Sequence, residues 1–326
     1  MANIKSASFY FICAASLSIA CVNAAQAQEY PAKAIRMVVP YSAGGGTDVF
    51  GRVIAKKLSE RWEQQVVVDN RAGAGGIVGT EIVAQAPRDG YTVLMLSNTH
   101  ALYSGFYKKL PFDPVKSFDA VVLVAIGPNV LVVHPSLPVQ TVAQLVSLAR
   151  RRPGELTFGS AGVGTTTQLA GELFKSMANI NVVHVPYKGS GQAEIDLAGG
   201  HVQYMIDSLP AALPNLRSGR TRAIATTDSK RAPALPNVPT VAESGLPNYE
   251  LNTWWGIVVP AGTPQSVISK LNKEIVQIMA LTDVKELLAS QGAESRTGSP
   301  ERFADYIKTQ IDFYGKIIAG AGIKPE

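Results

Sequence analysis

The sequence has few side chains that can act as nucleophiles or as soft metal ligands. Its 326 residues include two cysteines and four histidines, and both cysteines, Cys13 and Cys21, fall within the first 27 residues. The remainder therefore excludes disulfides, thiol catalysis and cysteine-ligated metals. A chain of about 300 residues buries enough apolar surface to fold without such cross-links.

Recognised catalytic and phosphate-binding motifs are also missing. The sequence has no GxSxG, HExxH, CxxC or paired-carboxylate motif. The Walker loop GxxxxGK[ST] and the dinucleotide fingerprint GxGxxG fail as well, since residues 159–164 read GSAGVG and residues 73–79 read GAGGIVG. We therefore expect no catalytic residue, no metal and no cofactor, and we expect that the protein is not an enzyme.

Charge and long apolar runs are sparse after the first 27 residues. Thirty basic residues against 25 acidic ones give a net charge of +5, and the densest basic run, Arg150–Arg152, ends a helical pattern where cations suit the helix dipole. The apolar stretch 120–133 is broken by Gly127-Pro128 and is shorter than the roughly 20 residues of a membrane span. Neither nucleic-acid binding nor a later membrane span is expected.

The first 27 residues have the pattern of an export signal. Lys5 precedes the apolar run FYFICAASLSIACV, and Ala25–Ala27 offers small residues for cleavage. Two alternatives are a retained membrane anchor and lipidation at Cys21; the run is short for the first, and no leucine stands three places before Cys21 for the second. We predict a cleaved signal peptide at 1–27 and a periplasmic protein.

The rest of the chain alternates between apolar strands and helical patterns. IRMVVPY, QQVVVDN and YTVLMLS read as strands with helices between them, and a second copy of this rhythm runs from VAQLVSLARRR to RAIATT. Such alternation favours an α/β fold with mainly parallel sheets flanked by helices, here as two lobes joined by two crossover strands. We place lobe 1 at 28–127 and 229–326, and lobe 2 at 128–228.

Five loops follow the carboxyl ends of predicted strands, which is where open parallel sheets bind ligands. They are rich in small and hydroxyl residues and read VVPYSAGGGTD, LMLSNTH, TFGSAGVGTTT, HVPYKGSG and YMIDSLP. Two lobes that face each other would bring these loops together in a cleft.

The first and third of these loops are built alike. Each leads from an apolar strand through glycines to hydroxyl residues that open a helix, as in GGGTD and GVGTTT. A helix N-terminus attracts anions, and glycine lets the backbone come close to a ligand. Each turn alone is also explained as a helix cap. Because neither turn has a phosphate-binding lysine, the pair favours a shared site for a small carboxylate.

Two aspartates in these loops have two interpretations each. Asp48 either pairs with Arg52 one helical turn later or accepts a hydrogen bond from a ligand or an ordered water. Asp207 either contacts the ligand or caps a helix over residues 209–219. The sequence leaves both choices open.

The histidines and tryptophans of the chain favour structural roles. His134 and His184 lie in apolar strand patterns that are typical of core or hinge residues. Trp254 and Trp255 either pack at the junction of the lobes or stack on an aromatic ligand.

Longer segments of the chain resemble a known family. They are IRMVVPYSAGGGTD, VVVDNRAGAGGIVGTEIVAQAPRDGYT, TFGSAGVGTTTQLAGELF, HVPYKGSGQAEIDLAGG, LPNVPTVAESGLPNYE and WWGIVVPAGTP. Over essentially the whole chain after residue 27, the sequence resembles the periplasmic substrate-binding receptors of tripartite tricarboxylate transporters, also called Bordetella uptake gene proteins. The resemblance implies a two-lobed Venus-flytrap fold of the type II-like periplasmic binding proteins.

The resemblance also implies a function and a set of ligand-binding residues. It implies that a small carboxylate (a di- or tricarboxylate or an aromatic carboxylate) is held in the interlobe cleft and delivered to membrane permease subunits. The residues at the matching positions are Tyr41, Gly45, Gly46, Thr47, Asp48, Ser97, Asn98, Thr99, Ser160, Gly164, Thr165, Thr166, Tyr187 and Asp207. Tyr41, Ala43 and Gly46 depart from the usual pattern of the first loop, so the resemblance does not fix the ligand.

Two other functions remain as alternatives at this point. One is a secreted α/β enzyme that acts on a carboxylate through Asp48, His184 or Asp207. The other is a co-receptor that presents the ligand to a sensor kinase, which the sequence does not separate from a transport receptor. We expect a monomer in either role.

Overall fold

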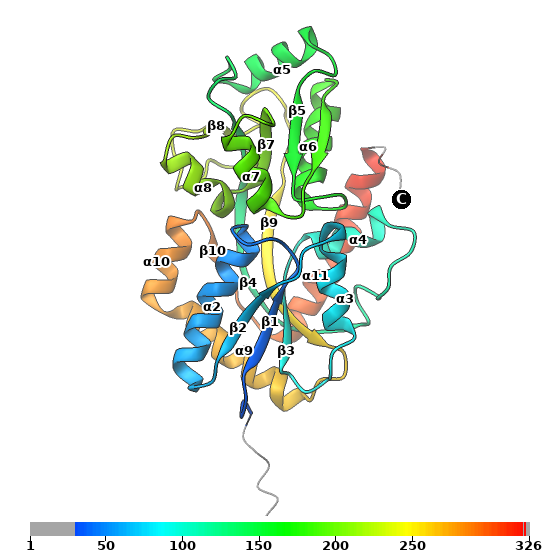
Figure 1. Cartoon of the computed structure of the whole chain (residues 1–326), viewed down its shortest axis with the longest axis vertical. Helices are drawn as coiled ribbons and strands as arrows, with labels where there is room; N and C mark the ends of the chain where they lie inside the picture. Colours follow the sequence, from blue (N-terminus) through cyan, green and yellow to red (C-terminus); the bar gives the residue numbers. More distant parts are fainter. Residues whose placement is uncertain (1–29, 322, 324–326) are drawn as a thin grey trace, which may run out of the picture. The chain divides into compact units, whose positions relative to one another are not determined.

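The computed structural model describes residues 30–321 and 323, so the predicted signal peptide at 1–27 lies outside the described residues. From Lys33 onward the chain forms one compact unit of alternating strands and helices (Figure 1). The two copies of the predicted strand–helix rhythm form two groups of elements, here called lobe 1 and lobe 2. The residue limits predicted for these lobes stay a prediction.

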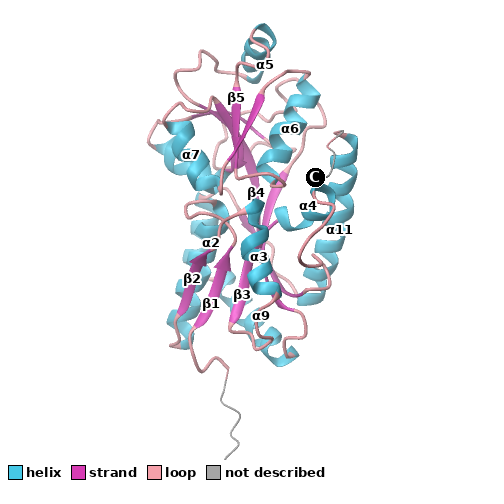
Figure 2. Cartoon of the chain, turned by 45° about the vertical axis from the view of Figure 1, so that its right-hand side comes forward, coloured by secondary structure: helices cyan, strands magenta, loops and turns pink. Residues whose placement is uncertain are grey.

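Lobe 1 is built on three parallel strands. Strand β1 (Ile35–Val39) lies between β2 (Val66–Asn70) and β3 (Thr92–Ser97) and pairs with both, and Figure 2 shows the three strands side by side. The helices of this part are α2 (Gly46–Trp62), α3 (Ile77–Ala84) with the short helix η1 (Ala74–Gly76) before it, and α4 (Thr99–Phe106). Helix α4 was not expected, because THALYSGF is rich in weak helix formers.

Lobe 2 repeats this construction. Strand β5 (Thr157–Ser160) pairs in parallel with β6 (Val183–Pro186) and β7 (Tyr204–Ser208). The remaining elements are β8 (Arg222–Thr226) and the helices α5 (Val142–Arg151), α6 (Thr166–Ala178), α7 (Ser190–Ala198) and α8 (Leu209–Arg217). The parallel pairing predicted within the strand–helix repeats is therefore confirmed in both lobes.

Two long strands connect the lobes and make the whole sheet mixed. Strand β4 (Phe118–Val133) pairs antiparallel with β9 (Asn252–Pro260) along its first part and with β7 and β8 along its last part. Gly127-Pro128 stands where β4 passes from one set of partners to the other. The strand order is β2-β1-β3-β9-β4-β7-β5-β6, so β9 lies at the centre of lobe 1 although it comes late in the sequence.

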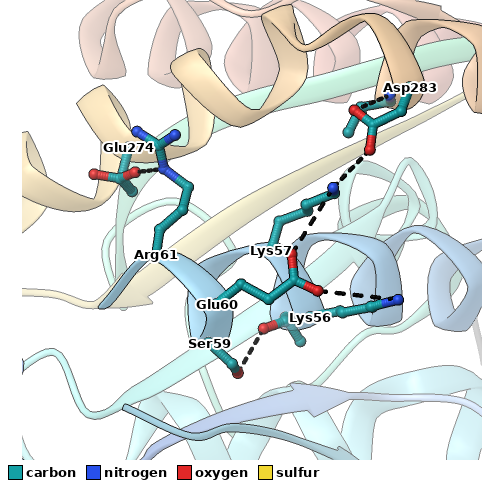
Figure 3. A network of polar contacts seen from close by, with 9 residues as sticks. Lys56, Lys57, Ser59, Glu60, Arg61, Glu274 and Asp283 are labelled. Atoms are coloured by element: carbon teal, nitrogen blue, oxygen red, sulfur yellow. Dashed lines mark hydrogen bonds and ion pairs between the residues drawn. The ribbon is translucent and has the colours of Figure 1, made fainter. Parts of the chain in front are cut away.

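The last part of the chain packs helices against lobe 1 and holds α2 in place. These elements are α9 (Gln265–Ala280), α10 (Thr282–Ser290), the short strand β10 (Glu294–Ser295) and α11 (Pro300–Gly320). Figure 3 shows charged pairs between them and α2: Lys57 Nζ lies 2.6 Å from Asp283 Oδ2, and Arg61 pairs with Glu274. The C-terminal half of α2 is thus fixed, while its first residue lies at the end of a cleft loop.

The largest hydrophobic cluster runs through both lobes. It includes Val38 and Leu94 of lobe 1, Phe158 and Phe174 of lobe 2, and Trp254 of β9. A core that is shared in this way stabilises β4 and β9 as the connection between the lobes.

Candidate functional site

A small pocket lies where the loops of the two lobes meet. Its volume, measured for the centres of water molecules, is about 40 Å³, which is space for a few water molecules. Residues from all five predicted cleft loops line it, together with two residues of β9. The lining residues are Tyr41, Gly45, Gly46, Thr47, Asp48, Ser97, Asn98, Thr99, Ala161, Thr165, Thr166, Thr167, Ser190, Asp207, Ser208, Thr253 and Trp255.

Five helices begin at this pocket. The lining residues include the first residue, or the one before it, of α2, α4, α6, α7 and α8. In α6 the side chain of Thr165 accepts a capping bond from the Gln168 N–H, whereas the other four helices have no capping bond from the side chain of their N-cap residue. The free N–H groups and partial positive charges of several helix starts therefore converge on one small space.

Asp48 is one of two charged residues that line the pocket, and its carboxylate is fully occupied. Oδ1 accepts from Asn70 Nδ2 at 2.9 Å, and Oδ2 accepts from Arg52 Nε at 2.9 Å and from the Gly44 N–H at 3.1 Å. Burial acts to raise the pKa of Asp48, but the hydrogen bonds from Arg52, Asn70 and Gly44 outweigh it and hold the pKa below its ordinary value. The predicted pairing with Arg52 is confirmed, and Asp48 fixes the start of α2 against the end of β2.

Asp207 is the other charged lining residue, and one of its oxygens is unoccupied. Oδ1 accepts from Ser190 Oγ at 2.9 Å and from the Ser208 N–H at 2.7 Å, whereas Oδ2 is buried without a partner among the described residues. Burial raises the pKa of Asp207 to about 6, although these hydrogen bonds oppose the shift. Lysine and arginine do not line the pocket, so no cationic side chain there balances this carboxyl.

A second buried carboxyl lies behind Asp207. Glu194 on α7 is 4% exposed, and its Oε2 accepts from Asn215 Nδ2 at 3.1 Å, while Oε1 has no partner among the described residues. Burial and the charge of Asp207 raise the pKa of Glu194 to about 8. Glu194 therefore holds a proton at neutral pH, since two nearby buried carboxyls cannot both be charged at low cost.

The lobes are hydrogen-bonded to each other at the pocket. Thr166 Oγ1 of lobe 2 donates to Asn98 Oδ1 of lobe 1 at 2.8 Å, and the Thr166 N–H donates to Thr99 Oγ1 at 3.2 Å. Tyr107, just after α4, donates through its hydroxyl to the carbonyl of Val163 at 2.9 Å. The pocket is thus shaped by a closed contact between the two lobes.

The structure brings most of the predicted ligand-binding residues to this pocket. Eleven of the fourteen line it: Tyr41, Gly45, Gly46, Thr47, Asp48, Ser97, Asn98, Thr99, Thr165, Thr166 and Asp207. Tyr41 is buried, and burial raises the pKa of its hydroxyl, with hydrogen bonds to Thr99 and Ser97 opposing the rise.

Three predicted residues lie outside the pocket. The hydroxyl of Ser160 lies 2.5 Å from His184 Nε2, and the hydroxyl of Tyr187 donates to Asp196 at 2.7 Å. Gly164 packs against the ring of Tyr107, with a φ of +74° that favours glycine. Successive side chains of a strand point to opposite faces, so at the end of β5 the residue that lines the pocket is Ala161 rather than Ser160.

Six lining residues were not predicted: Ala161, Thr167, Ser190, Ser208, Thr253 and Trp255. The first four fall within loops that were predicted to face the cleft, so only the choice of residue differed. Thr253 and Trp255 come from β9, and the sequence gave no sign that this strand reaches the pocket.

The two tryptophans of β9 point to different surroundings. The ring of Trp255 lies edge-on to Phe50, 4.6 Å between centroids, and lines the pocket. Trp254 packs against Phe303 and Tyr306 and donates from Nε1 to Gln310. Packing at the junction, which the sequence favoured for both residues, holds for Trp254.

Two further kinds of site were searched for in the described residues. Within 30–321 and 323, no three histidine, cysteine, aspartate or glutamate side chains come together as a metal site. No helix in this part of the chain combines the length and the apolar character that a membrane crossing needs.

Comparison with known proteins extends what the pocket suggests. Residues 50–323 match the family model described as "Tripartite tricarboxylate transporter family receptor". The protein BugT of Bordetella pertussis is 37% identical over 300 residues, which cover 91% of this chain and 92% of BugT.

Two solved structures are similar over their whole length. The R. palustris protein Rpa4515 with adipate has a TM-score of 0.89 at 38% identity and covers 91% of this chain and all of its own. The periplasmic binding protein BugD has a TM-score of 0.88 at 31% identity, again over 91% of this chain and all of its own. These likenesses confirm the two-lobed binding-protein fold.

The family match also bears on the enzyme alternative. The matched family is one of receptors, and the structural relatives are binding proteins. The prediction that the chain is not an enzyme is therefore confirmed by its relatives. With a family model that spans residues 50–323, the chain belongs to the receptor family of the tripartite tricarboxylate transporters.

Proposed function

We propose that this receptor binds a small carboxylate in the pocket between its lobes and delivers it to the membrane subunits of a tripartite transporter. The observation that carries this proposal is the convergence of five helix starts on a pocket that lysine and arginine do not line. N–H groups at helix starts bind anions without a cationic side chain. The relative Rpa4515 was solved with adipate, a dicarboxylate.

The ligand class is a di-, tri- or aromatic carboxylate, and the hydroxyl side chains favour such groups. The lining hydroxyls of Thr47, Ser97, Thr99 and Ser190 are each able to donate one hydrogen bond to a carboxylate oxygen. We further propose that Asp207 Oδ2, which has no partner in the described residues, accepts a hydrogen bond from the ligand or from a bridging water.

A thermal-shift series tests the ligand class. Dicarboxylates of four to eight carbons, citrate and benzoate are compared with uncharged diols and with diamines of the same chain length. A ligand at a hundredfold excess over its Kd stabilises the folded protein by about 2.7 kcal/mol. We expect a clear rise in melting temperature with at least one carboxylate and none with its matched diol or diamine. An equal rise with the diol, or no rise with any carboxylate, would show that the ligand class is wrong.

The role in transport needs a cellular test. Deletion of the gene should abolish uptake of the carboxylate found in that series, and a plasmid copy should restore it. Retained uptake after deletion would instead favour the sensor-kinase role. The mass of the protein recovered from the periplasm tests the proposed export, because cleavage after Ala27 removes residues 1–27.

A further inference from the structure

Away from the ligand-lining residues, the two lobes meet backbone to backbone at glycines. The loop before α2 faces the loop before α7, and the Ser42 N–H of the first donates to the Lys188 carbonyl of the second at 3.1 Å. At this contact a Cβ added to Gly191 would lie 2.0 Å from the carbonyl oxygen of Ala43. A Cβ on Gly189 would lie 2.4 Å from Ser42 Oγ.

A second contact of this kind lies at helix η1. A Cβ added to Gly75 of lobe 1 would lie 2.1 Å from the carbonyl oxygen of Val163 in lobe 2. That same carbonyl accepts the hydroxyl of Tyr107. Gly75, Gly189 and Gly191 are called the glycine seam below, and none of the three lines the pocket.

Gly191 differs from the other two glycines in one respect. Gly75 has a φ of +61° and Gly189 a φ of +140°, so their backbone conformations themselves favour glycine. Gly191 has no positive φ and is the second residue of α7, where alanine is the better helix former. The atoms that a Cβ on Gly191 would meet belong to Ala43 and Gly44, which are both in lobe 1.

We propose that the glycine seam sets how far the lobes close, with Gly191 as a positioning residue for ligand binding. This inference rests on the proposed binding in the closed cleft. Ordinary contact with a Cβ begins at 3.4 Å, so a side chain at position 191 would push the Ala43 carbonyl away from 2.0 Å to at least that distance. Ser190, which precedes Gly191 and lines the pocket, would move away from Gly45 by a similar amount.

The test compares three glycine-to-alanine variants. Gly191→Ala adds the wedge between the lobes. Gly315→Ala on α11 is the matched control, because no atom lies within 4 Å of the added carbon. Gly171→Ala adds a methyl group 2.2 Å from the ring of Phe158 inside lobe 2, which disturbs packing without touching lobe 1.

Closure is measured without reference to any ligand. Spin labels on cysteines introduced at Val67 of β2 and Val183 of β6, both exposed, report the distance between the lobes. The exported chain has no other cysteine if residues 1–27 are removed. We expect a longer distance with Gly191→Ala, and the unchanged distance with Gly315→Ala and Gly171→Ala. Gly171→Ala should lower the melting temperature instead.

Binding is measured on the same variants with adipate as the first probe. Gly191→Ala should weaken binding by at least about tenfold, because a methyl group forced into a close-packed contact disfavours the closed state. Equal label distances and equal affinity in Gly191→Ala and Gly315→Ala would overturn the inference. If the wild-type protein binds no carboxylate, the proposed function fails, while the label distances still decide whether the seam controls closure.

Discussion

Replacement of Glu194 by glutamine should change how the stability of the receptor depends on pH. Glu194 is 4% exposed, and its pKa rises from an ordinary 4.5 to about 8 because of burial and the charge of Asp207. The folded protein therefore binds this proton more tightly than the unfolded chain does. The stability that results is fully present below pH 4.5 and is lost as the pH rises towards 8.

The size of the effect follows from the same shift. One pKa unit corresponds to about 1.4 kcal/mol, so ionisation of Glu194 should cost the wild-type protein on the order of 3 kcal/mol between pH 5 and pH 8. The Glu194→Gln variant keeps an oxygen that accepts from Asn215 and carries no charge. Because the titration of Asp207 is present in both proteins, the difference between them isolates position 194 to a first approximation.

Urea unfolding followed by tryptophan fluorescence at pH 5, 6, 7 and 8 measures this difference. We expect the free energy of unfolding of Glu194→Gln, relative to wild type, to rise steadily across this range. Glu286→Gln, which removes an exposed carboxylate on α10, is the control and should follow the wild type at every pH. Parallel profiles of wild type and Glu194→Gln would refute the assignment of the buried proton to this carboxyl.

Three further substitutions test other parts of the site and the fold. Thr166→Val keeps the shape of the side chain but leaves Asn98 Oδ1 without its donor, so carboxylate binding measured by calorimetry should weaken by about tenfold; an unchanged Kd would contradict a role of this bond in the closed state. Asp48→Ala leaves three donors without their acceptor and should lower the free energy of unfolding in urea by about 2 kcal/mol, whereas a stable variant that has lost only ligand affinity would indicate direct contact with the ligand. Arg61→Ala breaks a partly exposed pair with Glu274 and should cost no more than about 1 kcal/mol; a larger loss in the same urea assay would show that the pair in Figure 3 anchors α2 more strongly than surface pairs do.

Much of the fold follows from patterns that are local in the sequence. The runs around β1, β3, β5 and β7 are apolar and short, and helical patterns separate them, so the parallel strand–helix repeats were predictable. Helix α4 was missed, since its stability comes from buried residues such as Leu102 and Phe106 rather than from intrinsic propensity.

The candidate site was predicted at the level of loops and less well at the level of residues. Ser160 and Tyr187 have the right chemistry and stand in the right loops, but their side chains bond to His184 and Asp196. The face of a strand on which a side chain lies depends on where the strand ends, and sequence patterns place such ends only to within a few residues.

The glycines were predicted to give a ligand access to the backbone, and the structure adds a different reason for some of them. A Cβ on Gly46 would lie 2.8 Å from Ser208 Oγ and 2.9 Å from a ring carbon of Trp255, so this glycine lets lobe 1 approach lobe 2 and β9. Contacts between residues so distant in the sequence leave no local pattern.

The position of β9 has a consequence for how the chain folds. This strand lies between β3 and β4, yet residues 252–260 follow nearly four-fifths of the sequence. Lobe 1 therefore cannot complete its sheet until most of the chain has been synthesised, and pairing between such distant segments is slow. A nascent chain with an open gap at the centre of its first sheet stays unfolded for longer, which suits a protein that is threaded through a membrane before it folds.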